Sequence, residues 1–228
     1  MNPIGFIKVL SVTFVTLFPV VNPIGDAPIF LSLTRCYSQA AQEVLARKIA
    51  AYGFTLLAVS FLFGSEILSF FGISLAIIQI TGGLIVASTG WSLLNQQVAA
   101  SSGEQASETL EDALQHAFYP LTLPITVGPG CISIAITLGA HLRHQAGPGF
   151  EHGYPRHFFA ALVGMALLCL LVWLCYGNAN RLVKILGSSG TNIVTRLSAF
   201  ILMAIGVQII WNGLRSGLPA MLANIAGT

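Results

Sequence analysis

Six long runs of apolar residues dominate this sequence and limit it to folds that cross a lipid bilayer. Two runs, residues 73–94 and 158–176, are uninterrupted, and each has the roughly 20 apolar residues that a membrane-spanning helix needs. Two more, residues 49–71 and 193–214, each contain one charged residue. Only 8% of all residues are charged, whereas soluble domains carry about 25%. We therefore predict an all-α integral membrane protein.

The remaining two runs, residues 9–33 and 117–140, are interrupted by proline and glycine. The first contains Asn22-Pro23-Ile24-Gly25-Asp26-Ala27-Pro28, and the second contains Pro120, Pro124 and Gly128-Pro129-Gly130. Proline removes a backbone donor and clashes with the preceding turn, and glycine lets the backbone turn tightly. Freed backbone groups are costly in hydrocarbon unless they are buried in protein or face a wet cavity. We therefore expect two unwound segments that face one hydrated site.

The six runs divide into two sets of three, and each set opens with a broken run. We expect residues 1–94 to form one three-helix repeat, residues 95–116 a polar acidic connecting loop, and residues 117–228 a second three-helix repeat. A repeat with an odd number of spans enters the membrane from alternate sides, so six transmembrane helices would form two inverted repeats. Secondary transporters use this arrangement, and a channel can use it too.

Basic residues in the connecting segments indicate the orientation. Five residues, Arg35, Arg47, Lys48, Arg181 and Lys184, lie on one side of the expected membrane, and four lie on the other. The positive-inside rule then places both termini outside the cytoplasm. The net charge of +2 gives no reason to expect a nucleic-acid partner.

The two breaks supply the candidate substrate site. N-terminal helix ends offer N–H donors and partial positive charge, whereas C-terminal ends offer carbonyl oxygens. A small zwitterion, such as an amino acid, suits both. We assign substrate binding to residues of both breaks: Asn22, Pro23, Gly25, Asp26, Thr126, Gly128, Pro129 and Gly130.

Charged and polar residues near the breaks allow alternative roles. Asp26 either binds a substrate ammonium or carries a proton, since acids inside membranes are usually functional, or it caps a helix that resumes at Ala27. Asn22 either binds substrate or satisfies freed backbone groups. Arg196 either extends to the membrane surface, or faces inward to pair with Asp26 or a substrate carboxylate, forming a charge or polar relay with Gln79.

The sequence predicts neither a metal site nor a bound cofactor. The four cysteines form no CxxC pair, and four histidines, His141, His144, His152 and His157, share one segment without helical ligand spacing. We expect no enzyme activity. A proton or Na⁺ is the expected coupling ion, because the chain has no ATP-binding GxxxxGK[ST] motif.

The motifs at residues 22–30 and 120–130 resemble those of the MarC family, also called the neutral amino acid transporter family, of UPF0056-type inner-membrane proteins. Residues 71–74, Gly82-Gly83 and residues 195–197 support this similarity, which covers nearly the whole chain. The resemblance implies six spans in a bacterial or archaeal inner membrane and transport of glycine and other small neutral amino acids, with export as an option. Two positions depart from the family pattern: Gln79 stands where arginine is common, and Asp26 where a neutral residue is common.

The leading hypothesis is therefore an ion-coupled secondary transporter or exporter of small neutral amino acids such as glycine or alanine. Its expected partners are the substrate, the lipid bilayer and, as an open option, further copies of the chain. The alternatives are a channel or a structural membrane subunit. A membrane redox relay is disfavoured, because Cys131 has Gly25 as its repeat counterpart and a dithiol relay needs a second thiol.

Overall fold

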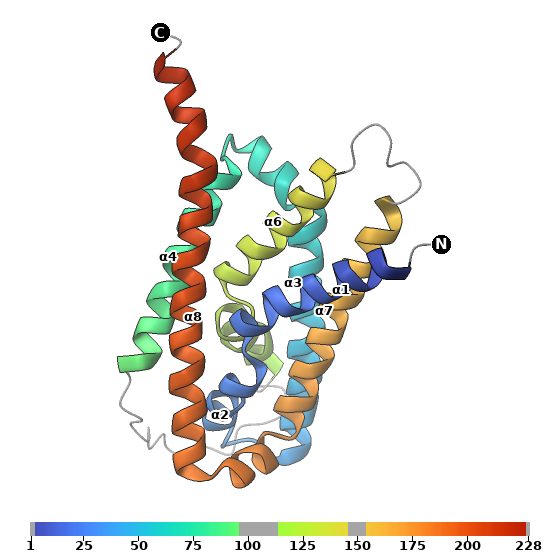
Figure 1. Cartoon of the computed structure of the whole chain (residues 1–228). Helices are drawn as coiled ribbons and strands as arrows, with labels where there is room; N and C mark the ends of the chain where they lie inside the picture. The colour runs from blue at the N-terminus through green and yellow to red at the C-terminus, as the bar shows by residue number, and fades with distance from the viewer. Residues whose placement is uncertain (1–2, 96–113, 146–153, 227–228) are drawn as a thin grey trace.

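The computed structural model describes residues 3–95, 114–145 and 154–226, and these residues are helical throughout apart from short connections (Figure 1). The elements are α1 (Pro3–Val21), α2 (Pro23–Leu33), α3 (Gln39–Phe70), α4 (Leu75–Asn95), η1 (Ala117–Thr126), α6 (Pro129–Gln145), α7 (Tyr154–Gly177) and α8 (Ala179–Ala226). The predicted all-helical membrane fold is confirmed.

Most of the expected spans appear as continuous helices. Five helices of the described chain are long and apolar enough to cross a membrane, and α1 with α2 counts as one of them, Ile4–Leu33. The expected span at residues 117–140 is instead a pair, Leu114–Thr126 and Pro129–Arg143, bent by 69°. The number of spans is six if this bent pair crosses the membrane as one. The six-span count and the inverted repeat stay predictions, and most of the predicted loop at 95–116 lies outside the described residues.

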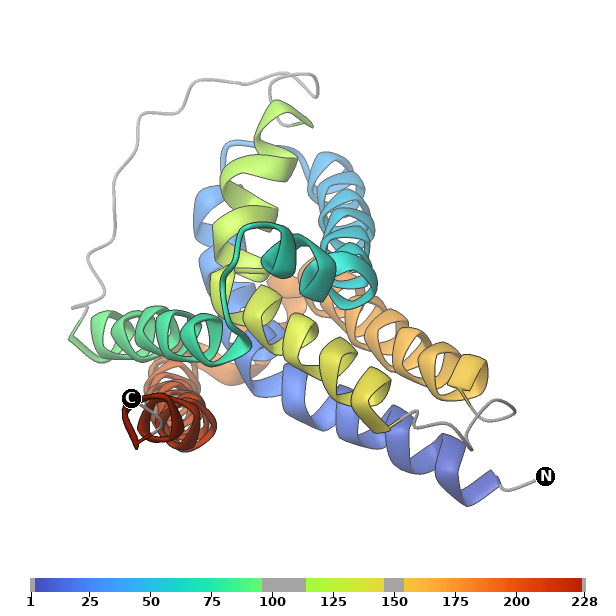
Figure 2. The ribbon, with the colours of Figure 1, turned by 90° about the horizontal axis from the view of Figure 1, so that it is seen from above.

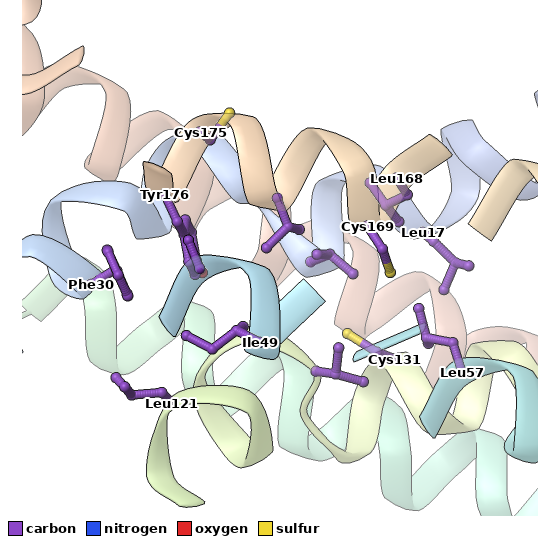
Figure 3. Packing of buried hydrophobic residues seen from close by; sticks show 14 of the residues in the cluster. Leu17, Phe30, Ile49, Leu57, Leu121, Cys131, Leu168, Cys169, Cys175 and Tyr176 are labelled. Atoms are coloured by element: carbon purple, nitrogen blue, oxygen red, sulfur yellow. The ribbon is translucent and has the colours of Figure 1, made fainter. Parts of the chain in front are cut away.

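The protein core lies where α1, α3, α6 and α7 meet (Figures 1 and 3). Leu17, Leu57 and Leu168 are fully buried there, and Phe30 of α2 stacks on Tyr176 of α7 with ring centroids 4.7 Å apart. Large apolar side chains also cover the outside of the molecule, as with Phe70, which is 84% exposed. This outer apolar surface fits a lipid surrounding rather than water.

Helices α4 and α8 form a close antiparallel pair, and Figure 2 shows them together at one side of the bundle. The pairing order is reversed along the two helices, since Gly213 faces Ala76 whereas Gly90 faces Ala199. A Cβ atom placed on Gly83 would lie 2.7 Å from the carbonyl oxygen of Gly206. Small residues let two membrane helices approach this closely, so glycine is required at this contact.

Candidate functional site

The break between α1 and α2 is built on Asn22, which has left-handed backbone angles (φ 45°, ψ 52°). Asparagine is one of the few residues besides glycine that adopt this conformation readily. Its side-chain Oδ1 accepts a hydrogen bond from the backbone N–H of Gly25 at 3.3 Å, so Asn22 is the N-cap of α2. Pro23 occupies the first helical position, which suits proline. Asn22 thus satisfies a freed backbone group, as one of its two predicted roles required.

Asp26 does not cap a helix at Ala27, and that interpretation is wrong. The helix resumes four residues earlier, at Pro23, because Asn22 supplies the cap. Asp26 therefore lies in the first turn of α2, near the positive end of the helix dipole. Its carboxylate is buried and accepts a hydrogen bond from Asn22 Nδ2 at 3.3 Å. Among the described residues, no cation forms an ion pair with it.

Two predicted site residues of this break support the site without lining it. Pro23 and Gly25 are buried. A Cβ atom on Gly25 would overlap the Asn22 side chain, lying 2.7 Å from Oδ1. Gly25 therefore makes room for the cap.

The second break joins η1 to α6. Tyr119 and Leu123 have extended backbone angles inside η1, because each precedes a proline and a proline disfavours helical angles in the residue before it. The backbone N–H of Val127 donates to the carbonyl of Thr122 at 2.8 Å, and α6 starts afresh at Pro129. The chain turns sharply here, as the proline and glycine pattern predicted.

Thr126, which we assigned to substrate binding, is buried beside the cavity and does not line it. Its hydroxyl donates to the carbonyl of Leu121 at 2.8 Å and lies within hydrogen-bonding distance, 3.1 Å, of the Tyr176 hydroxyl. Thr126 thus fastens the end of η1 to α7.

The two breaks meet at a cavity of about 320 Å³. Five of the predicted site residues line it: Asn22, Asp26, Gly128, Pro129 and Gly130. The first N–H groups of a helix have no partner within that helix. At α6 these groups belong to Gly130 and Cys131, since Pro129 has none, and both residues line the cavity. A buried carboxylate and a helix N-terminus therefore share one space.

Helices α4 and α8 complete the cavity wall, and no sequence motif points to the residues that they contribute. The lining residues outside the predicted set are Val20, Ile29, Ile85, Val86, Thr89, Leu93, Pro124, Ile125, Cys131 and Leu202. Pro124, Ile125 and Cys131 adjoin predicted positions, and Ile29 lies in the motif at residues 22–30. The remaining lining residues lie in no motif, because they reach the cavity through packing between helices.

Glycine also brings α6 against α4 at the cavity. A Cβ atom on Gly130 would overlap the side chain of Val86, and one on Gly82 would lie 2.6 Å from Ser133 Oγ. Ser133 Oγ donates across the same contact to the carbonyl of Ile78 at 3.0 Å. These contacts fix the N-terminus of α6 at the cavity edge.

The predicted relay residues are not brought to the cavity. Gln79 is buried and its side chain accepts a hydrogen bond from Ser216 of α8 at 3.4 Å. Arg196 is exposed and lies 20 residues before Ser216 on the same helix, a separation of about 30 Å at 1.5 Å per residue. Arg196 forms no ion pair with Asp26 in the described chain. Its exposure agrees with the alternative that its side chain extends to the membrane surface.

Two further expectations concern segments that the structure describes only in part. Among the described residues, no group of three or more metal-ligating side chains could hold a metal ion. His152, one of the four histidines that share one segment of the sequence, lies outside the described residues. Residues 96–113 of the predicted acidic connecting loop also lie outside the described residues.

Several apolar helices around a buried core and a central cavity define an integral, multi-pass membrane protein. Residues 7–218 match the family described as MarC family integral membrane protein, and the chain belongs to this family. The predicted family resemblance is confirmed.

Relatives cover nearly the full length of the chain. It is 32% identical over 211 residues to the UPF0056 membrane protein YvbG of Bacillus subtilis, covering 91% of this chain and 95% of the relative. It is 30% identical over 211 residues to the UPF0056 membrane protein YhcE of Escherichia coli, covering 92% of this chain and 93% of the relative. It is 29% identical over 211 residues to the UPF0056 inner membrane protein MarC of Salmonella typhimurium, covering 90% of this chain and 94% of the relative. No solved structure matches the chain. These similarities bear out the predicted inner-membrane location.

Proposed function

We propose that this protein is a secondary transporter of small neutral amino acids such as glycine or alanine, and that the central cavity holds the substrate. One observation carries the proposal: both broken segments line the same cavity, where the carboxylate of Asp26 faces a space that also contains the N-terminus of α6. Broken helices that meet at one site are the pattern of substrate sites in secondary transporters.

The cavity offers a complementary partner for each part of an amino acid. The substrate carboxylate would accept hydrogen bonds from the N–H groups of Gly130 and Cys131, where the helix dipole favours negative charge. The ammonium would bind Asp26, with Asn22 beside it. Apolar side chains of α4 and α8, including Val86 and Leu202, would contact the substrate side chain. A neutral amino acid uses all three contacts, whereas a simple anion or cation uses only one.

An inverted repeat would let the cavity open to each side in turn. The antiparallel pairing of α4 and α8, the last helix of each proposed repeat, supports this arrangement. In such folds one repeat rocks against the other around a fixed site. Asp26, the buried carboxylate at the cavity, is the proposed residue for coupling to a proton or Na⁺. Transport in the export direction is equally compatible with this mechanism.

The test is uptake of radiolabelled glycine and alanine by proteoliposomes under an imposed pH or Na⁺ gradient. We expect saturable uptake that the gradient accelerates, and loss of the gradient-driven part in Asp26→Asn. The matched control is Glu66→Gln, because Glu66 is a surface acid paired with Arg143 outside the cavity, and surface ion pairs contribute only about 0–1 kcal/mol. Absence of flux for every small neutral amino acid in both directions would refute the proposal. Uptake that never saturates would favour the channel alternative.

A further inference from the structure

A second hollow runs along the outer face of α3 and α7, away from the central cavity. Its polar end has a volume of about 520 Å³ and is lined by Glu43, Arg47, Trp173 and Asn178, among others. An apolar cleft of about 240 Å³, lined by Phe54, Ala166 and Leu170, shares Arg47 and Trp173 with the polar end. We call the two parts together the α3–α7 groove.

The polar end of this groove presents two opposite charges that form no ion pair with each other. Glu43 and Arg47 are four residues apart on α3, the spacing at which a glutamate and a basic residue usually pair. In the described part of the chain, however, Arg47 forms no ion pair. Glu43 accepts a hydrogen bond from Gln39 Nε2 at 3.4 Å instead. Both charged side chains are exposed, so each is available to a ligand.

The length of the groove matches one leaflet of a bilayer. Ala166 at its apolar end and Gly177 at its polar end are 11 residues apart, which is about 17 Å along α7. Half of a hydrocarbon core of about 30 Å is about 15 Å. Trp173 is 41% exposed between the two parts, and tryptophan is enriched at membrane–water interfaces. The charged end therefore belongs at the headgroup level and the apolar cleft among the acyl chains.

We propose that the α3–α7 groove binds one phospholipid with a zwitterionic headgroup. The lipid phosphate binds the Arg47 guanidinium, which suits phosphate oxygens because it donates several parallel hydrogen bonds. The headgroup ammonium binds Glu43, and one acyl chain lies in the apolar cleft against Phe54 and Ala166. A purely anionic lipid would use Arg47 and be repelled by Glu43. The pair of opposite charges therefore favours phosphatidylethanolamine over phosphatidylglycerol.

Native mass spectrometry of the full chain tests the headgroup contacts. The protein is taken from membranes with equal phosphatidylethanolamine and phosphatidylglycerol, and retained lipid is counted. We expect one retained phosphatidylethanolamine, and about tenfold less retention in Arg47→Gln, the factor for losing one charge-assisted hydrogen bond. The matched control is Lys48→Gln, an exposed cation next in sequence that does not line the groove. Glu43→Gln should shift the preference toward phosphatidylglycerol.

A second pair of variants tests the acyl-chain cleft without changing charge. Ala166→Trp fills the cleft and should lower lipid retention, whereas Leu167→Trp, at a neighbouring exposed position outside the groove, should not. Soluble glycerophosphoethanolamine, which has the headgroup and no acyl chain, should fail to compete. Equal retention by parent, Arg47→Gln and Ala166→Trp proteins would overturn the proposal. A lipid preference unchanged by Glu43→Gln would overturn the zwitterionic assignment. Neither result depends on whether the protein transports amino acids.

Discussion

Replacing Asn22 with alanine removes three features that hold the α1–α2 break in shape. The variant loses the cap that Oδ1 provides to the Gly25 N–H and the hydrogen bond from Nδ2 to Asp26, both 3.3 Å long. It also replaces asparagine, which adopts left-handed backbone angles readily, with alanine, which cannot form the local side-chain hydrogen bond that makes them tolerable. We expect this single change to destabilise the fold measurably.

The cost follows from these three contributions. Loss of an N-cap costs about 1 kcal/mol, and an ordinary residue in the left-handed region costs about 1 kcal/mol. A side-chain hydrogen bond inside a membrane protein contributes about 0.6 kcal/mol on average. The Asn22→Ala protein should therefore lose roughly 2.5 kcal/mol of unfolding free energy. Asn22→Gly should lose about 1 kcal/mol less, because glycine tolerates the backbone angles.

The assay is reversible unfolding in mixed micelles, with increasing dodecyl sulfate in a mild detergent. The control is Asn212→Ala, which removes an exposed amide that accepts a hydrogen bond from Gln208 at 3.0 Å, and which should stay within about 0.5 kcal/mol of the parent protein. A double-mutant cycle with Asp26→Ala, which removes the acceptor, isolates the Asn22–Asp26 hydrogen bond. The reasoning fails if Asn22→Ala matches the parent protein, or if alanine and glycine at this position are equally destabilising.

Three further changes test the packing around the site. Gly83→Ile would force α4 away from the Gly206 carbonyl oxygen, so we expect a loss of about 1–3 kcal/mol in the same unfolding titration; parent-like stability would contradict the close contact. Thr126→Val leaves the buried Tyr176 hydroxyl without this partner and should cost about 1 kcal/mol; no loss would show that the hydrogen bond contributes nothing. Gly130→Val should abolish saturable uptake, because the added side chain would overlap Val86 at the cavity edge and displace the N-terminus of α6; unchanged uptake kinetics would contradict the proposed substrate location.

The sequence predicts the helices well because the bilayer imposes one simple requirement on each of them. A span needs a long apolar run, and the run at residues 73–94 reappears as α4 (Leu75–Asn95) with its ends shifted by one or two residues. Proline and glycine also located both breaks, since Pro23 and Pro129 each begin a new helix. These features depend on local chemistry, which a sequence displays directly.

The cavity wall was harder to predict because it depends on which helix faces which. Thr89 and Leu202 lie in mostly apolar stretches of α4 and α8, where hydrophobic periodicity does not distinguish a cavity-facing side from a lipid-facing side. The role of Asp26 was misjudged in part for another reason. Asparagine and aspartate are comparable N-caps, and only the backbone angles show that Asn22 has this role.

The two alternatives for Arg196 could not be separated from the sequence, because a long cationic side chain on a membrane helix can be accommodated in two ways. It can pair inside the protein, or extend along the helix to the headgroups. The sequence shows the arginine near one end of its span but not the neighbours that would hold it inside. The structure leaves Arg196 exposed and about 30 Å from the Gln79 contact on α8.

The most direct test of the central cavity is the chemical accessibility of Cys131 in a protein with its other three cysteines replaced by serine. Cys131 lines the cavity although it is only 2% exposed, whereas Cys169 is buried outside this cavity, at the apolar acyl-chain cleft of the α3–α7 groove. We predict that a small water-soluble methanethiosulfonate modifies Cys131 and that glycine or alanine slows this modification. In a control protein that keeps Cys169 as its only cysteine, we predict that Cys169 stays unmodified. Failure of the reagent to reach Cys131, or modification that no neutral amino acid slows, would contradict a hydrated substrate cavity between the two broken helices.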